Sequence, residues 1–256
     1  MATTAEILSR VATRPTWAEV SLTALRQNFR TVQKHVGANV TVCAVVKADA
    51  YGHGAVECSR ALEAEGAKWL GVTSLDEAIP LREAGIRANI LLMTGFWRGE
   101  ESEIIRLHLT PTVWEPWHIE TLETAAAALG VARHPVHLKV DTGMGRLGVA
   151  VDQLPGVLAA MQAAKHLVLE GLSTHLASSE IMDAPSVAEQ ERSFDNGQGN
   201  MVFEELASCP VVRCSGVERC IGKLGVARQD SRDVGGRFVH FLVLRAAVSR
   251  SLSRTR

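Results

Sequence analysis

The sequence predicts an α/β protein built as a (β/α)8 barrel of the TIM type, incomplete at its C-terminal end. From residue 17 to about residue 178, short apolar runs alternate with longer segments of helical period. Strands that keep alternating with helices form a parallel sheet covered by helices. The repeat of about 25–30 residues suits a chain of barrel size, roughly 250 residues, and this chain has 256.

A doubly wound open sheet has the same alternation and is the alternative fold. Its dinucleotide-binding form carries G-x-G-x-x-G after the first strand. No such string follows the first apolar run of this chain. The barrel is therefore favoured over the open sheet.

The predicted strands are the apolar runs, and the predicted helices lie between them. Thr23 is expected to begin the first helix, because its hydroxyl can accept a hydrogen bond from an unpaired backbone N–H. Gly37, Gly66, Gly85 and Gly130 stand where helices should end, since glycine adopts the left-handed conformation at no steric cost. The predicted strands are residues 17–22, 40–46, 69–73, 89–93, 110–114, 136–140 and 167–172, and the predicted helices are residues 23–36, 55–65, 75–84, 100–108, 115–129 and 153–165.

The pattern changes after residue 183. A polar segment of helical character, residues 186–194, is followed by residues 195–200, which are rich in Gly and Asn. The rest holds three of the five cysteines, an apolar run at 237–248 and a Ser/Arg end. We divide the chain into an N-terminal extension (1–16), a barrel (17–194) and a divergent tail (195–256). A truncated or frame-shifted terminus is favoured over an ordinary divergent end of a domain.

Composition excludes several classes of function. The formal net charge is -1, which argues against nucleic acid or an anionic membrane as the main partner. The five cysteines are irregularly spaced and form no C-x-x-C, so we expect reduced thiols in a cytoplasmic protein, with a structural zinc site a poor second. No metal is predicted. We expect neither a signal peptide nor a membrane span, because residues 1–16 hold no apolar stretch of signal-peptide length and no apolar run is long enough to cross a membrane.

Three predicted strand ends carry candidate chemistry, and the first carries Lys47. The string V-T-V-C-A-V-V-K-A-D-A-Y-G-H-G delivers Lys47 from an apolar strand, with Asp49, Tyr51 and His53 in the loop that follows. Active sites of parallel barrels lie at this end of the strands. An amine in a partly desolvated site can attack an aldehyde, and Tyr51 could contact what the amine holds. The alternative is a rim lysine in a salt bridge with Asp49.

The other two strand ends add a cationic loop and a histidine. In V-H-L-K-V-D-T-G-M-G-R-L-G, Lys139 and Asp141 end a strand, and a loop with three glycines carries Arg146. Glycines let a backbone approach a ligand closely, and a guanidinium supplies a fixed cationic fork. We therefore favour ligand contact over an ordinary connection. His175 follows the last predicted strand; such a histidine is more often structural, but it belongs to the same face.

These stretches resemble the N-terminal barrel of the alanine racemases. The likeness rests on K-A-D-A-Y-G-H-G, K-V-D-T-G-M-G-R-L-G and S-T-H, and covers residues 14–194. It implies that Lys47 holds pyridoxal 5'-phosphate as a Schiff base and serves as one of two acid/base groups. It also implies that Tyr51 contacts the phosphate, Arg146 the phenolic oxygen and His175 the ring face. Lys139 would position Arg146, and is carbamylated in many members.

The resemblance also implies an activity and its partners. The activity is interconversion of L-alanine and D-alanine for peptidoglycan precursor supply, by a cytoplasmic homodimer in which a tyrosine from the neighbouring subunit's β-rich C-terminal domain is the second base. The strand at 17–22 would then pair outside the barrel, with that second domain. In these proteins the last barrel strands carry an Asn-Ser pair and an Arg-x-Gly segment.

This chain departs from that pattern in its tail. Its one tyrosine is Tyr51, so the second base has no candidate, and neither strand motif is matched. The segment Cys214–Ser215–Gly216 and Arg237 are not adopted as substitutes. Little or no racemisation, and doubtful dimerisation, are expected. Two alternatives stay open: a single-domain protein that binds pyridoxal phosphate for cofactor homeostasis without turnover, and a fragment that cannot fold alone.

Overall fold

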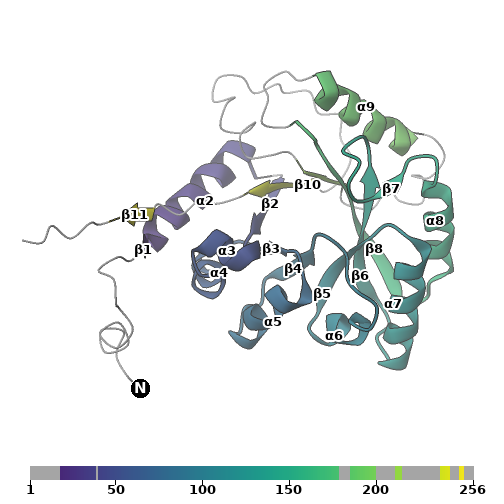
Figure 1. The fold of residues 1–256 in the computed structure, drawn as a ribbon, viewed down its shortest axis with the longest axis horizontal. Helices are drawn as coiled ribbons and strands as arrows, with labels where there is room; N and C mark the ends of the chain where they lie inside the picture. The colour runs from purple at the N-terminus through teal and green to yellow at the C-terminus, as the bar shows by residue number, and fades with distance from the viewer. Residues whose placement is uncertain are drawn as a thin grey trace, which may run out of the picture.

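The computed structural model describes residues 18–38, 40–178, 185–199, 211–214, 237–242 and 248–250. Eight of its strands pair in parallel, each with the next along the chain, and the last returns to the first (Figure 1). This ring confirms the predicted (β/α)8 barrel. Its strands are β2 (Val40–Val45), β3 (Trp69–Val72), β4 (Asn89–Leu92), β5 (Leu109–Val113), β6 (His134–Asp141), β8 (Leu167–His175), β9 (Val211–Cys214) and β10 (Arg237–Leu242).

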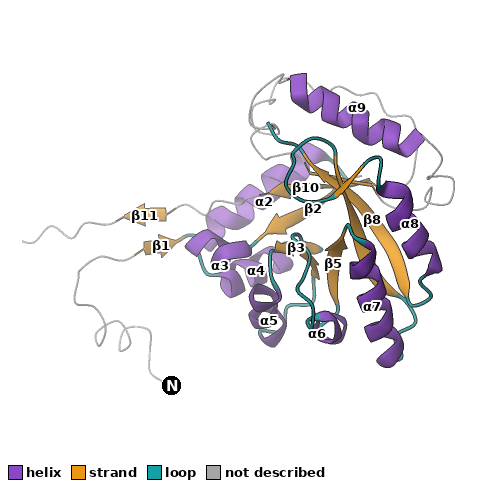
Figure 2. Cartoon of the chain, turned by 45° about the vertical axis from the view of Figure 1, so that its right-hand side comes forward, coloured by secondary structure: helices purple, strands orange, loops and turns teal. Residues whose placement is uncertain are grey.

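Helices follow the first six barrel strands and lie outside the sheet (Figure 2). Ser21 caps α2 (Leu22–Val36), the helix that precedes β2, since its Oγ accepts from Ala24 N–H at 3.2 Å. The prediction of Thr23 was wrong, because the cap residue must precede the first helical turn for its side chain to reach that N–H. The predicted glycine stops are confirmed, each with positive φ. The helices are α2 (Leu22–Val36), α3 (Lys47–Gly52), α4 (Ala55–Ala64), α5 (Leu75–Glu83), α6 (Glu101–Arg106), α7 (Pro116–Ala128), α8 (Leu154–Ala163) and α9 (Pro185–Gly199).

The barrel has its least extensive strand pairing at its last two strands, β9 and β10. β9 and β10 come from the segment assigned to the divergent tail, in which no strand was predicted. Their mutual register is a single residue pair, and the β10–β2 register is interrupted once. Among the described residues, no helix follows either strand. Residues 1–17 and most of the tail lie outside the described residues, and so do the proposed extension and the substitutes Ser215 and Gly216.

A two-stranded antiparallel sheet lies apart from the barrel. It pairs β1 (Ala18–Val20) with β11 (Val248–Arg250), at the left of Figures 1 and 2. The strand predicted at 17–22 therefore stays out of the barrel, as the resemblance implied. Its partner here is the tail of the same chain.

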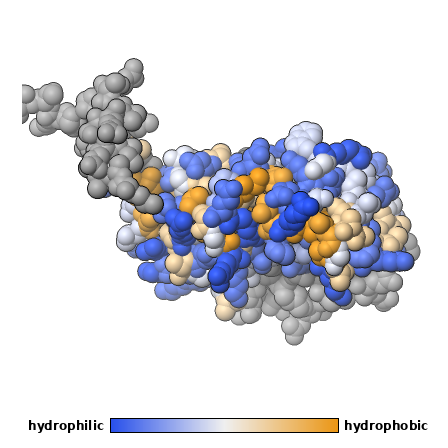
Figure 3. Space-filling model, turned by 90° about the horizontal axis from the view of Figure 1, so that it is seen from below, coloured by the Kyte–Doolittle hydropathy of each residue, from blue (hydrophilic) through white to orange (hydrophobic). Residues whose placement is uncertain are grey.

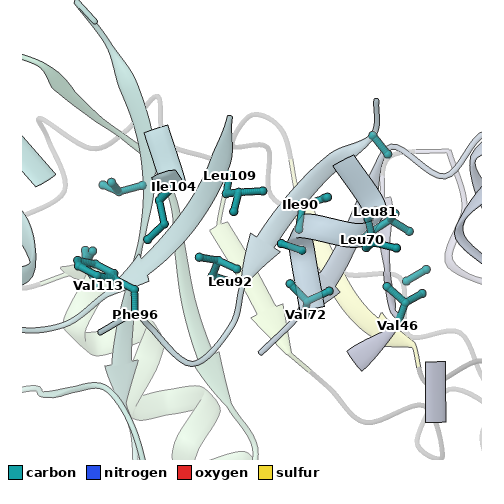
Figure 4. Packing of buried hydrophobic residues seen from close by; sticks show 14 of the residues in the cluster. Val46, Leu70, Val72, Leu81, Ile90, Leu92, Phe96, Ile104, Leu109 and Val113 are labelled. Atoms are coloured by element: carbon teal, nitrogen blue, oxygen red, sulfur yellow. The ribbon is translucent and has the colours of Figure 1, made fainter. Parts of the chain in front are cut away.

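The main hydrophobic core lies between the barrel strands and their covering helices. Successive side chains of a strand point to opposite faces, so Val46, Leu70, Val72, Ile90 and Leu92 all point outward, where helical side chains cover them (Figure 4). All five are at most 2% exposed. Burial of one such side chain contributes about 1.5–3 kcal/mol, so this layer is the main source of stability for the barrel.

The interior of the barrel is filled by the alternate set of side chains. Cys43, Trp69 and Leu91 form a separate buried cluster. Polar residues share the same strand faces and are also buried, among them Thr112, His137, Lys139 and Ser173. The interior is therefore largely polar up to the C-terminal ends of the strands. On β6, Lys139 is the last buried residue that points inward.

Arg82 ties the opposite end of the barrel together. Its guanidinium donates to the carbonyl oxygens of Ile86 and Ala88 at 2.8 Å, of Leu107 at 2.9 Å and of His108 at 3.0 Å. These carbonyls precede β4 and β5, so one side chain on α5 fixes where both strands begin.

The outer surface is mixed in character. Figure 3, seen from below, shows apolar patches set among a majority of hydrophilic side chains. Within the described ranges, none of the helices is both long and apolar enough to cross a membrane.

Candidate active site

The structure brings the predicted site residues to one end of the barrel. Lys47 follows β2, Lys139 lies near the end of β6, and His175 is the last residue of β8. β6 and β8 are direct neighbours, with Lys139 opposite Ser173, two residues before His175. Lys139 is 7% exposed, whereas Lys47 and His175 are half-buried and Arg146 is exposed.

The turn that carries Lys47 is left-handed over four consecutive residues. Ala48, Asp49, Ala50 and Tyr51 have φ between 50° and 58° and ψ between 37° and 49°. Each non-glycine residue in this conformation costs about 1–2 kcal/mol. Local hydrogen bonds hold the turn: Ala50 N–H donates to Val46 O at 2.8 Å, and Gly54 N–H to Asp49 O at 3.0 Å. The site therefore rests on strained backbone that its surroundings must hold in place.

The carboxylate of Asp49 belongs to this turn. Its Oδ1 accepts from Ala55 N–H at 2.6 Å, at the start of α4. Across the described ranges, no ion pair joins Asp49 to Lys47. The alternative of a rim salt bridge is therefore wrong, because the acid is engaged in capping the next helix.

Glu77 supports the same turn from α5, the helix that follows the neighbouring strand β3, and its role was not predicted. Its Oε1 accepts from Ala48 N–H at 2.7 Å, and its Oε2 from Thr73 N–H at 2.7 Å and Thr73 Oγ1 at 2.8 Å. Burial acts to raise the pKa of Glu77, but these hydrogen bonds outweigh it and lower the pKa below its ordinary value. The string S-L-D-E at 74–77 could have indicated a helix cap, but not a contact with β2.

The Arg146 loop folds back onto β6 through a single carboxylate. Asp141 Oδ1 accepts from the N–H groups of Gly143 and Met144 at 2.9 Å and of Gly145 at 3.1 Å. Burial acts to raise the pKa of Asp141, and these three bonds lower it below its ordinary value. Gly148 has φ +123°, and a Cβ there would lie 2.6 Å from Asp141 N. The short strand β7 (Val149–Ala150) then pairs with β6, which fixes both ends of the loop.

Gln190 on α9 joins the loops that follow β6 and β8, and it too was missed. Its Nε2 donates to His175 O at 3.1 Å and to Thr142 Oγ1 at 3.4 Å, while its Oε1 accepts from Ala177 N–H at 2.9 Å. The side chain is 3% exposed. Thr142 and Thr174 also share a hydrogen bond of 2.8 Å. A glutamine in a polar helix gave no signal in the sequence.

A buried histidine lies in an aromatic cluster at the same end of the barrel. His118 contacts the rings of Phe96, Trp114 and Trp117, and its Nδ1 accepts from Glu115 N–H at 3.2 Å. Burial lowers the pKa of His118 to about 4. Its neutral form is therefore the one compatible with the folded state at neutral pH.

We expect the free energy of unfolding to fall as the pH drops from about 6.5 to 4. The pKa of His118 is about 4 when folded against 6.5 ordinarily, so in this range the unfolded chain binds the extra proton. The loss should reach about 3 kcal/mol at most for this residue. Burial likewise lowers the pKa of His134 to about 4. Urea unfolding at a series of pH values measures the slope; His118→Asn should flatten it, and the exposed control His35→Asn should not.

A family model and curated proteins of known name match this chain. A model of the N-terminal domain of alanine racemase matches residues 20–216. The chain belongs to the alanine racemase family. The alanine racemases of Sorangium cellulosum and Geobacter sulfurreducens are 44% and 40% identical to it, over 71% and 66% of this chain and 49% and 44% of their own. The chain thus spans about half the length of the curated relatives it matches.

Solved alanine racemase structures share the fold. That of Clostridium difficile, in complex with cycloserine, has a TM-score of 0.76 at 27% identity, over 90% of this chain and 60% of its own. That of Streptomyces coelicolor has a TM-score of 0.72 at 30% identity, over 88% and 58%. The resemblance drawn from the strand-end motifs is confirmed. The individual roles of Lys47, Tyr51, Lys139, Arg146 and His175 stay predictions.

Proposed function

We propose that this site holds pyridoxal phosphate covalently through Nζ of Lys47 and acts on the α-carbon of alanine. The observation that supports it most is the placement of Lys47. A lysine ends an apolar strand on a strained turn, half-buried, at the barrel end where Lys139 and His175 also lie. Membership in the alanine racemase family supports the same cofactor.

The residues present fit the chemistry of this cofactor. Pyridoxal phosphate has a phosphate, a phenolic oxygen and an aromatic ring. We assign the Tyr51 hydroxyl to the phosphate, Arg146 to the phenolic oxygen and His175 to the ring face. Tyr51 is 38% exposed and Arg146 is exposed, so both can reach a ligand. We assign to Lys139, which is buried on β6 ahead of the Arg146 loop, the positioning of the guanidinium through a carbamylated side chain.

When bound, pyridoxal phosphate acts as an electron sink for the charge left when the α-proton departs. Lys47 Nζ would take that proton from one face of the α-carbon and return it. Racemisation needs a second acid/base on the opposite face. The one tyrosine of this sequence is Tyr51, which we assign to the phosphate, so this chain does not supply that group as a tyrosine.

The wider roles are part of the same proposal. Alanine as substrate, a homodimer, a cytoplasmic location and supply of D-alanine for the cell wall all follow from the family. The single tyrosine favours a second candidate, a protein that binds pyridoxal phosphate without racemase turnover.

Reductive trapping tests the covalent attachment. The purified chain is incubated with pyridoxal phosphate, reduced with borohydride, digested and mapped by mass spectrometry. We expect the adduct on the peptide that bears Lys47 and none above background on the peptide that bears Lys139. An unmodified Lys47 peptide, or equal modification of several lysines, would contradict the proposal.

A further inference from the structure

We infer that Glu77 is a positioning residue for this site: its carboxylate joins the ends of β2 and β3 and thereby sets where Lys47 and Tyr51 point. The inference rests on the proposed function of Lys47. Glu77 does not touch the reacting atoms, and we assign it no chemical step.

The contact with β2 goes beyond capping a helix. Ser74 caps α5, because its Oγ accepts from Glu77 N–H at 3.3 Å. A cap alone needs only groups at the start of its own helix. Glu77 Oε1 instead reaches Ala48 N–H, 29 residues earlier in the chain and next to Lys47. The other oxygen holds Thr73, directly after β3. Both strand ends are therefore fixed to one rigid carboxylate.

The contact falls where the backbone most needs support. Ala48 is the first of the four left-handed residues that connect Lys47 to Tyr51. Without the hydrogen bond from Ala48 N–H to Glu77, the turn could relax toward the right-handed conformation that L-residues prefer. Such a change rotates the chain on both sides of Ala48, and so moves the amine of Lys47 relative to the ring of Tyr51.

Only a carboxylate of this length satisfies both strand ends. Glutamine has the same shape but one acceptor oxygen, so its amide nitrogen would face the N–H of either Ala48 or Thr73. Aspartate keeps the charge but is one methylene shorter. The two substitutions therefore separate the charge of Glu77 from its reach.

The chain offers a matched control at the other end of the barrel. Glu63 Oε1 accepts from Arg87 N–H at 2.7 Å and Ala88 N–H at 2.6 Å, before β4. Glu63→Gln thus also removes a carboxylate that accepts from two backbone N–H groups. Because both bonds go to one oxygen, which the glutamine amide retains, Glu63→Gln should lower the thermal midpoint less than Glu77→Gln does, and it should leave the Lys47 turn unaltered.

The first measurement is the rate of Lys47 modification by pyridoxal phosphate, followed by borohydride trapping and peptide mapping. Glu77→Gln and Glu77→Asp should both react about tenfold more slowly, the factor expected for loss of one charge-assisted hydrogen bond. Glu63→Gln should match the unaltered chain. Equal rates in all four proteins, each folded by circular dichroism, would overturn the inference.

The second measurement needs no cofactor. Burial, and then the charge of Glu77, raise the pKa of Tyr51, and Tyr51 is the one tyrosine in the sequence. Its phenolate absorbance therefore reports on one group. The titration midpoint should fall in Glu77→Gln and stay near its original value in Glu77→Asp and Glu63→Gln. An unchanged midpoint in Glu77→Gln would mean that Glu77 does not face Tyr51.

The two measurements separate this inference from the proposed function. If the unaltered chain forms no adduct on Lys47, the proposed function fails, and the Tyr51 titration still tests whether Glu77 shapes the turn. If the adduct forms but ignores Glu77, only the inference fails. If Glu77→Gln does not fold, Glu77→Asp still decides, because slow modification with an unchanged Tyr51 midpoint supports it and normal modification overturns it.

Discussion

Replacement of Lys47 by alanine is expected to abolish the borohydride-sensitive visible absorbance of the cofactor-loaded protein. The absorbance requires an amine lone pair within bonding distance of the aldehyde. Lys47 is the residue that the turn after β2 presents at the barrel end. The neighbouring lysine, Lys139, is 7% exposed and lies within β6, where it is not free to swing into the place of Lys47. The loss should be complete and not partial.

Two further variants make this result specific. Lys47→Arg keeps the positive charge but removes the nucleophile, because arginine stays protonated in proteins, and it should also lose the absorbance. Lys68 is exposed just before β3, at the opposite end of the barrel, so Lys68→Ala should keep it. Lys47→Ala could still bind cofactor non-covalently through the remaining site residues, and such cofactor would be removed by gel filtration. Full absorbance in Lys47→Arg would assign the attachment to another lysine.

The barrel itself could be predicted because its signal is periodic. The strands from 40 to 172 and the helices between them lie where apolar runs and helical period placed them, with ends shifted by up to three residues. β9 and β10 could not be recognised from the alternation of apolar runs and helical segments. They lie in a stretch of mixed cysteine, arginine and glycine, where the pairing is set by neighbouring strands and not by a local pattern.

The site was predictable only where residues act from the strand that carries them. Lys47, Lys139 and His175 stand at strand ends, and that position can be read from the sequence. Glu77 and Gln190 act across elements: Glu77 contacts a turn 29 residues earlier, and Gln190 reaches Thr142 from 48 residues away. Such contacts depend on how two elements pack, so a carboxylate on a helix or a glutamine in a polar segment gave no sign of its role.

Exchange of the α-proton of alanine is expected to outpace inversion in this chain. In deuterated buffer, Lys47 Nζ would remove the proton from one face and return a deuteron to the same face. Inversion needs delivery to the other face, and a positioned acid/base contributes a factor of about 10²–10⁴ to such a transfer. With Tyr51 the one tyrosine, we expect deuterated alanine of unchanged configuration to accumulate about 100-fold faster than its enantiomer.

Mass spectrometry of alanine after separation of the enantiomers measures both rates in one reaction. L-alanine and D-alanine should be tried separately, because the face that Lys47 serves decides which of them exchanges faster. Lys47→Ala is the control, and it should lose exchange from that enantiomer. If inversion keeps pace with exchange, a group other than tyrosine serves the second face, and the chain is a competent racemase as it stands. If neither occurs while the Lys47 adduct forms, the site binds cofactor without activating the amino acid. In that case the amino acid does not displace Lys47 from the cofactor.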